Sequence, residues 1–426
     1  MNNNRLSSGL INCFLYPFVG LVSSLRHWRE SWSKNAFWLA CVYFGAVLIY
    51  CPEGSILGAG GDGGRYVLRL MDMYNNSSIT LGSILSLYLN NPRYLDVYQQ
   101  LMTFFVSRFT DNGHVLFAVF AFVYGFFYSR NIWYILERLP NKRLGWVVIL
   151  VALYFLICPI TQINGVRMWT ALHVYVYGMM PFLLERDKSK IWWTLITPLI
   201  HFSFLSVALF GLLWFFLPIR IKTNSSTLLV ALVIFIVSIF VNTINMDMVG
   251  EMVEEYAPES VEEHLEGYMS EEYIARQADA NLLKNWYVGI SGSILSWSYN
   301  ILLILLLPCI KRYFNNDSGI LHLYTFALFL GSIANLMSLI PSGGRFQLLS
   351  QMFKVPLIIL VAMSVSLRSG FRRAVNYSLI LLILPLVFEI RKLFDYFSIT
   401  AILGNFITTL FWENNVPLID LIKRII

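Results

Sequence analysis

The sequence is short of charge. Asp, Glu, Lys and Arg make up 13% of the 426 residues, about half of the roughly 25% found in soluble domains. The net charge of +6 is spread over short segments and is not gathered into a patch. This distribution is typical of membrane proteins whose loops carry positive charge on one side. The sequence shows no concentrated basic patch of the kind that binds nucleic acid.

Further absences narrow the class of protein. The five cysteines lie mostly in or beside apolar runs and show no metal-ligand spacing. We interpret them as small packing residues and expect neither a metal nor a cofactor. The apolar runs do not alternate in polarity, as the strands of a membrane β-barrel would. The polar start "MNNNRLSSG" leads to no small-residue cleavage site, so we expect no signal peptide.

What the sequence does have is long apolar runs, such as "LGWVVILVALYFLICPI" and "TLLVALVIFIVSIFV". A helix of roughly 20 apolar residues crosses the hydrocarbon core of a bilayer. Because such runs recur along the chain, they predict an all-α fold, a polytopic membrane helical bundle of about 10–12 membrane segments.

Clusters of Lys and Arg orient this bundle. The stretches 25–34 and 130–143 are basic and are expected in the cytoplasm. The predicted organisation is a cytoplasmic or interfacial N-terminus (1–34), a single transmembrane domain (35–412) with external loops 52–112 and 245–286, and a tail (413–426). The expected spans are 35–51, 113–130, 144–160, 165–184, 227–244, 288–308, 320–340, 346–366 and 374–392, with a last span or interfacial helix at 398–412.

The segment 191–217 decides the sidedness of everything after it. As one long span it would place Arg220, Lys222 and the later basic clusters outside; as a broken, re-entrant hairpin it places them in the cytoplasm. Ten helical residues reach about 15 Å, half of a roughly 30 Å hydrocarbon core. The polar break "HFS" at 201–203 would then lie near the middle of the membrane or just outside it. We predict the hairpin.

Under this topology, polar residues gather at the outer face. Arg167 lies one turn inside an apolar stretch, where a guanidinium costs up to roughly 2.5–3.5 kcal/mol and requires an anionic partner. Arg345 begins the span after "PSGG", and Asp62 and Arg65 lie in "GGDGGRY". Helix N-termini attract anions, and Arg binds phosphate oxygens bidentately. We expect a membrane-embedded diphosphate to be the partner of both Arg167 and Arg345.

Simpler interpretations stay open for each feature. A single Arg at a helix end can extend toward lipid headgroups, and the glycines around Asp62 can form an external turn. His201 beside Ser203 can cap a broken helix. The acidic segment 245–286 is either a solvated cap or a sugar-stacking surface. The side chains that would form such a surface are Tyr256, Leu265, Tyr268 and Tyr273.

The order of these motifs resembles a known family, the EpsG family of bacterial exopolysaccharide polymerases, which are relatives of the Wzy-type repeat-unit polymerases. "GDGGRY" is similar to the family's Gly-x-Asp-x-x-x-Tyr, and the Tyr-led amphipathic stretch "YLDVYQQLMTFFVSRFTDN" follows it. "NGVRMWTA" resembles Asn-x-x-Arg-(Gln)-x-x-Ala, and "HFSFL" resembles a His-x-Ser motif in a short hairpin. Arg345 fits a late Arg before a span. Met168 departs from the pattern, because Gln is common there.

The resemblance covers about residues 35–366 and implies a glycosyltransferase. Such an enzyme would polymerise undecaprenyl-diphosphate-linked oligosaccharide repeat units into a surface polysaccharide at the periplasmic face of the bacterial inner membrane. Arg167 and Arg345, with Arg65, would hold the leaving diphosphate. Either Asp62 or His201 would be the catalytic base. The supporting residues would be Tyr66, Asn164 and Ser203. Besides its lipid-linked substrate, the enzyme would have membrane lipid and a chain-length regulator as partners.

Three rival functions share part of this pattern. An O-antigen ligase would use the same two-Arg diphosphate site and differ in its acceptor. A membrane O-acyltransferase would use His201 as base, but it would need a pocket reached from the cytoplasm. A lipid-linked oligosaccharide flippase would spread its cations along a central cavity between two similar halves. The cations expected here gather at one face, which counts against the flippase.

Overall fold

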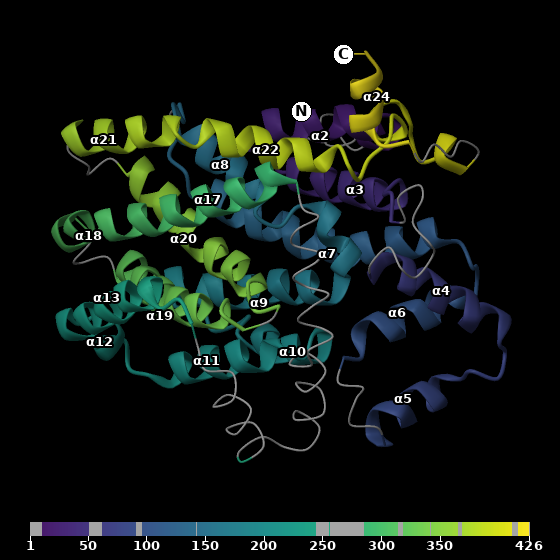
Figure 1. The fold of residues 1–426 in the computed structure, drawn as a ribbon, viewed down its shortest axis with the longest axis horizontal. Helices are drawn as coiled ribbons and strands as arrows, with labels where there is room; N and C mark the ends of the chain where they lie inside the picture. Colours follow the sequence, from purple (N-terminus) through teal and green to yellow (C-terminus); the bar gives the residue numbers. More distant parts are fainter. Residues whose placement is uncertain are drawn as a thin grey trace.

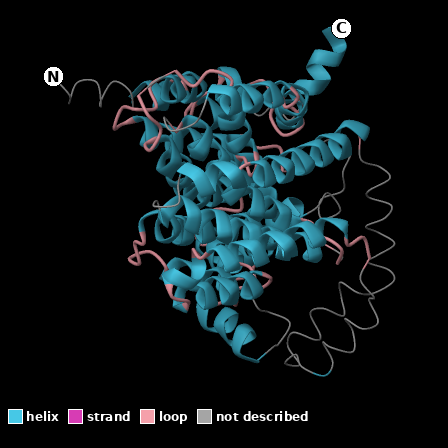
Figure 2. Ribbon diagram, turned by 90° about the vertical axis from the view of Figure 1, so that its left-hand side faces the viewer, coloured by secondary structure: helices cyan, strands magenta, loops and turns pink. Residues whose placement is uncertain are grey.

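The computed structural model describes residues 11–50, 62–90, 96–141, 143–243, 255, 285–313, 318–340, 342–364, 369–410 and 416–425. Within these ranges every regular element is a helix and none is a strand (Figure 2). The all-α prediction is therefore confirmed. The acidic segment 245–286, with its four candidate sugar-stacking residues, lies almost wholly outside the described ranges.

Five helical stretches are long and apolar enough to cross a membrane, which confirms the polytopic prediction. They are Gly113–Leu136 (α7), Val147–Glu185 (α8 to α9), Trp286–Ile310 (α17 and most of α18), Gly319–Met337 (α19) and Arg345–Met363 (α20). Figure 1 shows these helices stacked across the molecule with their long axes roughly horizontal. The other helices around them are α3 (Ser33–Ala46), α10 (Trp192–Ile200), α11 (Phe204–Phe216), α12 (Ile219–Lys222), α13 (Ser225–Phe240), α21 (Ser369–Ile380) and α22 (Ile383–Leu393).

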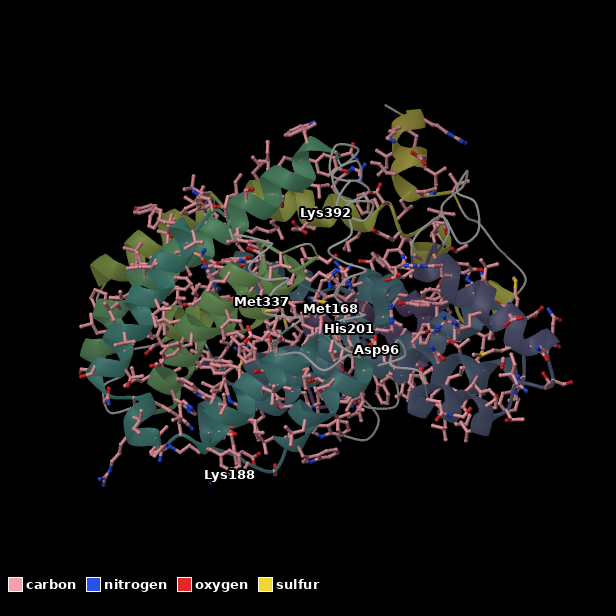
Figure 3. All side chains as sticks on the ribbon, turned by 60° about the horizontal axis from the view of Figure 1, so that its bottom comes forward. Asp96, Met168, Lys188, His201, Met337 and Lys392 are labelled. Atoms are coloured by element: carbon pink, nitrogen blue, oxygen red, sulfur yellow. The ribbon has the colours of Figure 1, made fainter. Side chains whose placement is uncertain are left out.

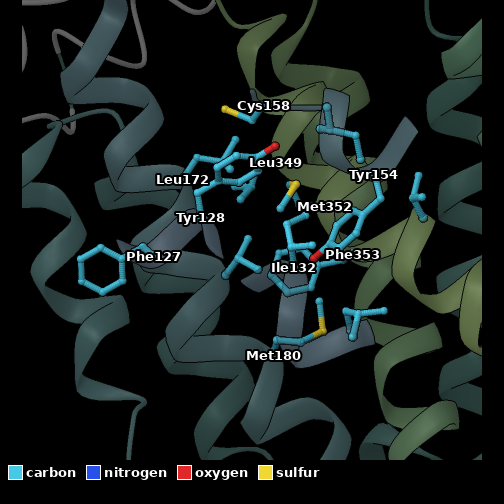
Figure 4. Close-up of a cluster of buried hydrophobic side chains, with 14 of the residues drawn as sticks. Phe127, Tyr128, Ile132, Tyr154, Cys158, Leu172, Met180, Leu349, Met352 and Phe353 are labelled. Atoms are coloured by element: carbon cyan, nitrogen blue, oxygen red, sulfur yellow. The ribbon is translucent and has the colours of Figure 1, made fainter. Parts of the chain in front are cut away.

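The core lies where α7, α8, α9 and α20 meet (Figure 4). Aromatic rings such as Tyr128, Tyr154 and Phe353 are buried there with aliphatic side chains. In a bilayer no water satisfies a buried hydroxyl, so each needs a partner inside the protein. The Tyr128 hydroxyl accordingly donates to the Phe155 carbonyl oxygen at 2.6 Å, and this bond ties α7 to α8.

The stretch Val147–Glu185 is two spans. Its 39 residues exceed what one crossing needs, and the helix is interrupted at Pro159 by the 3-10 turn η1 (Ile160–Gly165). Tyr154 lies against Asn131 and Cys158 against Tyr124, so α8 runs antiparallel to α7. The ends of α7 and α9 meet through the Arg138–Glu185 ion pair, so α9 returns alongside α7. The turn therefore separates the two predicted spans.

Helices α10 and α11 form the predicted re-entrant hairpin. Thr194 packs on Gly178, and the Ser203 hydroxyl lies 3.7 Å from the Met168 sulfur, so α10 runs antiparallel to α9. Helix α11 then returns, because the Phe215 ring packs on Phe182 with centroids 5.2 Å apart. Both feet of the hairpin lie at one end of the bundle, and its tip, 201–203, lies at the level of the start of α9.

The two ends of the bundle differ in chemistry. One end, called here the basic end, carries Lys34 paired with Glu137 at 3.2 Å, and Lys222 beside the ring of Phe182. The opposite end, called the capped end, is covered by three short helices from the expected external segment 52–112 (Figure 1). They are α4 (Asp62–Asn75), α5 (Leu81–Asn90) and α6 (Tyr98–Ser107).

The C-terminal third departs from two expectations. The predicted span 374–392 is interrupted, because a turn at 381–382 separates α21 from α22. The apolar piece at 398–412 is no span in its described part: it forms only α23 (Thr400–Leu403) and the 3-10 turn η2 (Thr408–Leu410). This piece folds back on the N-terminal helices, where the Tyr43 hydroxyl donates to the Thr400 carbonyl oxygen at 2.5 Å. The flanking helices are α2 (Pro17–Arg26) and α24 (Leu418–Ile425).

Large apolar side chains face outward around the bundle. Phe240 on α13 is 70% exposed and Leu381 beside α22 is 73% exposed. Contiguous exposed apolar surface of this kind is rare on soluble proteins and fits contact with lipid tails.

Close packing of the hairpin on α9 yields a prediction for Gly178. A Cβ added there would lie 2.6 Å from the Thr194 hydroxyl oxygen and 3.0 Å from the Thr194 backbone nitrogen. We expect Gly178→Ala to lower the free energy of unfolding by about 1–3 kcal/mol, as overpacking does. Gly289→Ala on α17 is the matched control, because its Cβ meets no atom within 4 Å. Thermal unfolding in detergent measures both, and an unchanged Gly178→Ala would contradict this packing.

The hairpin also predicts sidedness. Reporters fused at Lys188 and at Lys222, before and after the hairpin, should read on the same side of the membrane. A reporter at Thr110, between the cap and α7, should read on the opposite side. Opposite readings at the first two positions would mean that 191–217 crosses the membrane as a single span.

Candidate substrate site at the capped end

A partly buried ion pair joins Arg167 to Asp96. Arg167 is the second residue of α9, and its Nη1 atom lies 3.0 Å from Asp96 Oδ2. The Asp96 side chain is only 7% exposed. Its other oxygen, Oδ1, accepts a hydrogen bond from the backbone N–H of Phe202 at 2.6 Å. One carboxylate therefore holds together the start of α9, the cap and the tip of the hairpin. Figure 3 shows Asp96, His201 and Met168 close together.

The hairpin tip is also held by its backbone. The N–H of Val97, next to Asp96, donates to the Leu199 carbonyl oxygen at 3.0 Å. At the tip, His201 Nδ1 accepts from the backbone N–H of Ser203 at 3.2 Å, and the Ser203 hydroxyl lies 2.8 Å from the same nitrogen. A neutral ring whose Nδ1 is an acceptor carries its proton on Nε2. The ring is thus held in the turn between α10 and α11.

The motif "GDGGRY" packs α4 onto η1 through Gly63. A Cβ at this position would lie 2.4 Å from Asn164 Oδ1 and 3.0 Å from the Tyr50 carbonyl oxygen, so only glycine fits without a shift. One turn later on α4, Tyr66 is buried beside Arg167. Burial raises the pKa of the Tyr66 hydroxyl to about 12, so it stays protonated at neutral pH.

Five buried polar atoms around Arg167 form no hydrogen bond of ordinary geometry with the described residues, although Tyr66 lies close to Arg167 and Tyr98 lies close to Thr170. Arg167 Nε is one of them; of the others, one is on η1, one is on α9 and two are in the cap. Those others are Tyr66 Oη, Tyr98 Oη, Asn164 Oδ1 and Thr170 Oγ1. Buried polar groups are as a rule hydrogen-bonded. A concentration of hydroxyls with a guanidinium N–H suits a ligand rich in oxygen, such as a phosphate or a sugar.

Asp62 and Arg65 pair with each other on α4. Arg65 is 65% exposed; the charges of both residues act on Tyr66, and that of Asp62 acts also on Arg167. The structure thus brings Asp62 to the neighbourhood of Arg167 and leaves Arg65 outside it. The roles expected for both residues stay predictions.

Arg345 starts α20 at the same end. A Cβ at Gly343 would lie 1.7 Å from the Met337 carbonyl oxygen, so glycine is required in the turn that sets the start of α20. The next residue, Phe346, packs on Phe204 just after the hairpin tip, with centroids 5.9 Å apart. Among the described residues, no carboxylate pairs with Arg345. No contact in the described structure joins the guanidinium groups of Arg345 and Arg167, although both lie beside the hairpin tip.

The sequence interpretation missed Asp96. The partner of Arg167 was expected to be a lipid diphosphate, and that stays a prediction; the partner that the structure shows is a carboxylate of the protein itself. The available signal was an acidic residue between two tyrosines in "YLDVYQQ". Tyr98 and Thr170 were missed as well, because unpartnered hydroxyls can be recognised only in three dimensions.

Two cavities adjoin the turn η1. A cavity of about 300 Å³, called here the polar chamber, lies among α8, η1, α17, α20 and α22. Its polar lining residues include Gln162, Tyr299, Gln351, Glu389, Lys392 and Asp395. An apolar groove of about 650 Å³ lies among α2, α3, α8 and α22. It extends from Leu25 and Leu144 near the basic end to Ile160 in η1. The two cavities share Leu156, Pro159 and Leu393.

The fold and the site together define the class: a polytopic helical membrane protein with a buried, cation-bearing site at one end of the bundle. In the described part of the chain, no group of three His, Cys, Asp or Glu residues could hold a metal ion. The model of the EpsG family matches residues 37–402, most of the chain, and the protein belongs to this family. Membership indicates a protein of exopolysaccharide biosynthesis with polymerase-type activity. No curated protein and no solved structure matches the chain.

The Arg167–Asp96 pair can be tested by a double-mutant cycle. Asp96→Asn leaves a largely buried guanidinium without its counter-charge, so we expect the free energy of unfolding to fall by about 1–3 kcal/mol. Arg167→Gln should cost less once Asp96→Asn is present, because the two residues act as a unit. Thermal unfolding measures the cycle, with Asp72→Asn on the exposed face of α4 as control. Additive effects at Asp96 and Arg167 would contradict a direct pair.

Proposed function

We propose that the protein is a glycosyltransferase that polymerises lipid-diphosphate-linked oligosaccharide repeat units, of the undecaprenyl type, at the capped end. The observation that carries the proposal is the set of five unpartnered polar atoms around Arg167. They surround a cation at the start of a 20-residue helix. Such a site offers guanidinium, phenol and helix-terminal N–H donors to a phosphate at one place.

The charge distribution supports a periplasmic location for this site. Lys and Arg in short loops mark the cytoplasmic side of a membrane protein. The basic end carries such residues in the loops before and after the hairpin, including Lys188, Lys190, Arg220 and Lys222. The capped end therefore faces the outside, which in a bacterial inner membrane is the periplasm.

Arg345 supports the diphosphate assignment. Arg167 is partly neutralised by Asp96, whereas Arg345 has no described counter-charge. Leu348 lies one helical turn after Arg345 and lines the polar chamber. Its neighbour Phe346 packs next to the hairpin tip. Arg345 therefore lies on the part of α20 that is between the hairpin tip and the polar chamber. A diphosphate between Arg167 and Arg345 would lie next to the chamber.

The cavities suit the other parts of such a substrate. The polar chamber offers carboxylates, amides and a buried Tyr299 hydroxyl without a hydrogen-bond partner among the described residues. These are groups that bind sugar hydroxyls. The apolar groove runs along most of the depth of the bundle and ends at η1, which suits a polyprenyl tail whose phosphates reach the capped end.

The reaction assigned to the site is a substitution at the anomeric carbon of the donor glycan. A hydroxyl oxygen of the acceptor unit forms the new bond while the bond to the lipid diphosphate breaks. The leaving diphosphate gains negative charge, and Arg167 and Arg345 stabilise it. The acceptor proton goes to a base. His201 Nδ1 already accepts from the Ser203 N–H, which favours Asp62 as the base.

The location of His201 also bears on the acyltransferase alternative. That activity requires a base reached from the cytoplasm, and the hairpin tip lies at the capped end, away from the basic end. The remaining close competitor is a ligase, which would share the site. A ligase and a polymerase differ in the product that accumulates when the protein is removed.

Arg167→Lys should lose most chain extension, by at least about tenfold, because an ammonium makes no bidentate contact with phosphate. The protein should still insert and fold, since Lys keeps a charge for Asp96. Arg69→Lys is the matched control, because Arg69 lies in the same cap and, among the described residues, hydrogen-bonds Gln99 alone, at 2.8 Å. The measurement is polymer length on gels from cells carrying each variant.

Two results would redirect the proposal. Full polymer from Arg167→Lys would remove the diphosphate role of Arg167. Finished polymer that builds up on its lipid carrier when the gene is deleted would identify a ligase, whereas single lipid-linked repeat units identify the polymerase.

A further inference from the structure

A second polar cavity lies at the basic end, far from the Arg167 site. Its volume is about 360 Å³, and it lies between the ends of α3, α7 and α9 and the foot of the hairpin. The polar and charged side chains that line it include Lys34, Arg130, Asn131, Tyr134, Tyr177 and Lys190. Nothing in the proposed polymerase chemistry uses these residues.

The cavity has more positive than negative charge. Lys34 is balanced by Glu137, 3.2 Å away, which is also the carboxylate of the lining. Arg130 hydrogen-bonds the neutral oxygens of Ser129 and Asn35, each at 2.8 Å, and forms no ion pair with a described carboxylate. It also stacks on the rings of Trp38 and Phe126, at 4.7 and 4.3 Å. The guanidinium is therefore held in place by neutral groups and aromatic faces alone.

Lys190 is the other cation of the lining without a direct counter-ion. Its ammonium lies 4.5 Å from the centre of the Tyr177 ring. Asp187, three residues earlier, is in electrostatic range, but its carboxylate is exposed and accepts from the Ser189 backbone N–H at 2.9 Å. Two positive charges in the cavity thus lack an ion-pair partner within the described chain.

The lining also includes the phenol of Tyr134. Its Oη atom is buried and forms no hydrogen bond of ordinary geometry with the described residues, although the Glu185 carboxylate lies close to it. The cavity therefore presents a guanidinium, an ammonium and a phenol donor, while its Asn131 amide donates elsewhere, to the His173 carbonyl oxygen at 2.8 Å. Donors of this kind bind the oxygens of an anion.

The position of the cavity favours a lipid over a soluble anion. Arg130 lies six residues before the end of α7 at Leu136, about 9 Å inside it at 1.5 Å per residue. Phe126, Val176 and Met180 line the deeper part. Basic pockets between membrane helices on the cytoplasmic side bind the headgroups of anionic lipids.

We propose that this cavity binds the phosphate of an anionic glycerophospholipid from the cytoplasmic leaflet, with Arg130 and Lys190 as its cationic contacts. The Tyr134 hydroxyl donates to the same phosphate, and the lipid chains follow the apolar lining. Because Lys190 lies at the foot of the hairpin and Arg130 on α7, the bound lipid bridges these two elements.

The test uses the purified full chain in detergent and short-chain phosphatidylglycerol as the probe. Phosphatidylglycerol should raise the unfolding temperature in a saturable way, whereas phosphatidylcholine should not. Lys190→Gln and Arg130→Gln should each weaken the apparent affinity by about fivefold, as expected for one interfacial charge. Lys188→Gln is the matched control: it lies two residues away in the same loop, is exposed, and does not line the cavity (Figure 3).

Tyr134→Phe provides a test that leaves all charges in place. It removes only the unpartnered hydroxyl and should weaken phosphatidylglycerol binding about two- to fivefold without lowering the unfolding temperature of the lipid-free protein. This variant keeps the proposal testable if Arg130→Gln fails to fold.

Three outcomes would overturn the proposal. If Lys188→Gln and Lys190→Gln weakened the affinity for phosphatidylglycerol equally, the lipid would be attracted by diffuse surface charge and not by a site. Unchanged binding in Lys190→Gln and Tyr134→Phe would place the lipid elsewhere. Tighter binding of a polyprenyl monophosphate, with the same sensitivity to these variants, would assign the cavity to a carrier lipid in place of a glycerophospholipid. None of these outcomes depends on the polymerase activity.

Discussion

The carboxylate of Asp96 is the interaction on which the capped end depends. It pairs with Arg167 at the start of α9 and accepts from the Phe202 N–H at the hairpin tip. Apolar surroundings cannot satisfy the polar groups of a cation near a helix end in a membrane protein. The same holds for the backbone groups at the break of a re-entrant hairpin. One buried acid satisfies both. The hairpin, the cap and the arginine are consequently fixed relative to one another before any substrate arrives.

Glycines make this arrangement sterically possible. Gly63 lets α4 approach Asn164, Gly178 lets α10 approach α9, and Gly343 lets the chain turn past the Met337 carbonyl into α20. Each is a place where a Cβ would meet a backbone atom or a polar oxygen at 3.0 Å or less. The motif "GDGGRY" therefore has a packing role beside any chemical one: its second glycine brings Tyr66 and Asp62 to the helix that carries Arg167.

The sequence was sufficient for the features that depend on local composition. Apolar runs predicted the spans, and the basic residues Arg220 and Lys222 predicted the hairpin, because only a re-entrant segment keeps them with the other cations. It was insufficient where a partner lies far along the chain. Asp96 and Arg167 are 71 residues apart, and a polar external segment gave no reason to expect three helices or a buried acid within it. The turn between α21 and α22 was missed for the converse reason, since the residues on either side of it, 379–384, are all apolar.

The pairing of Arg167 also bears on how a polymerase site could release its product. Nη1 is committed to Asp96, while Nε has no described partner, so one edge of the guanidinium is held and another can bind. A cation already balanced by an acid attracts a resting diphosphate less strongly than a bare cation would. Catalysis requires contacts that strengthen as charge develops on the leaving group, and uniformly tight binding does not provide them. On the proposed chemistry, Asp96 holds Arg167 in place and limits how tightly Arg167 binds the ground-state diphosphate. Arg345 has no described counter-charge, and its attraction for the leaving diphosphate rises as the bond breaks.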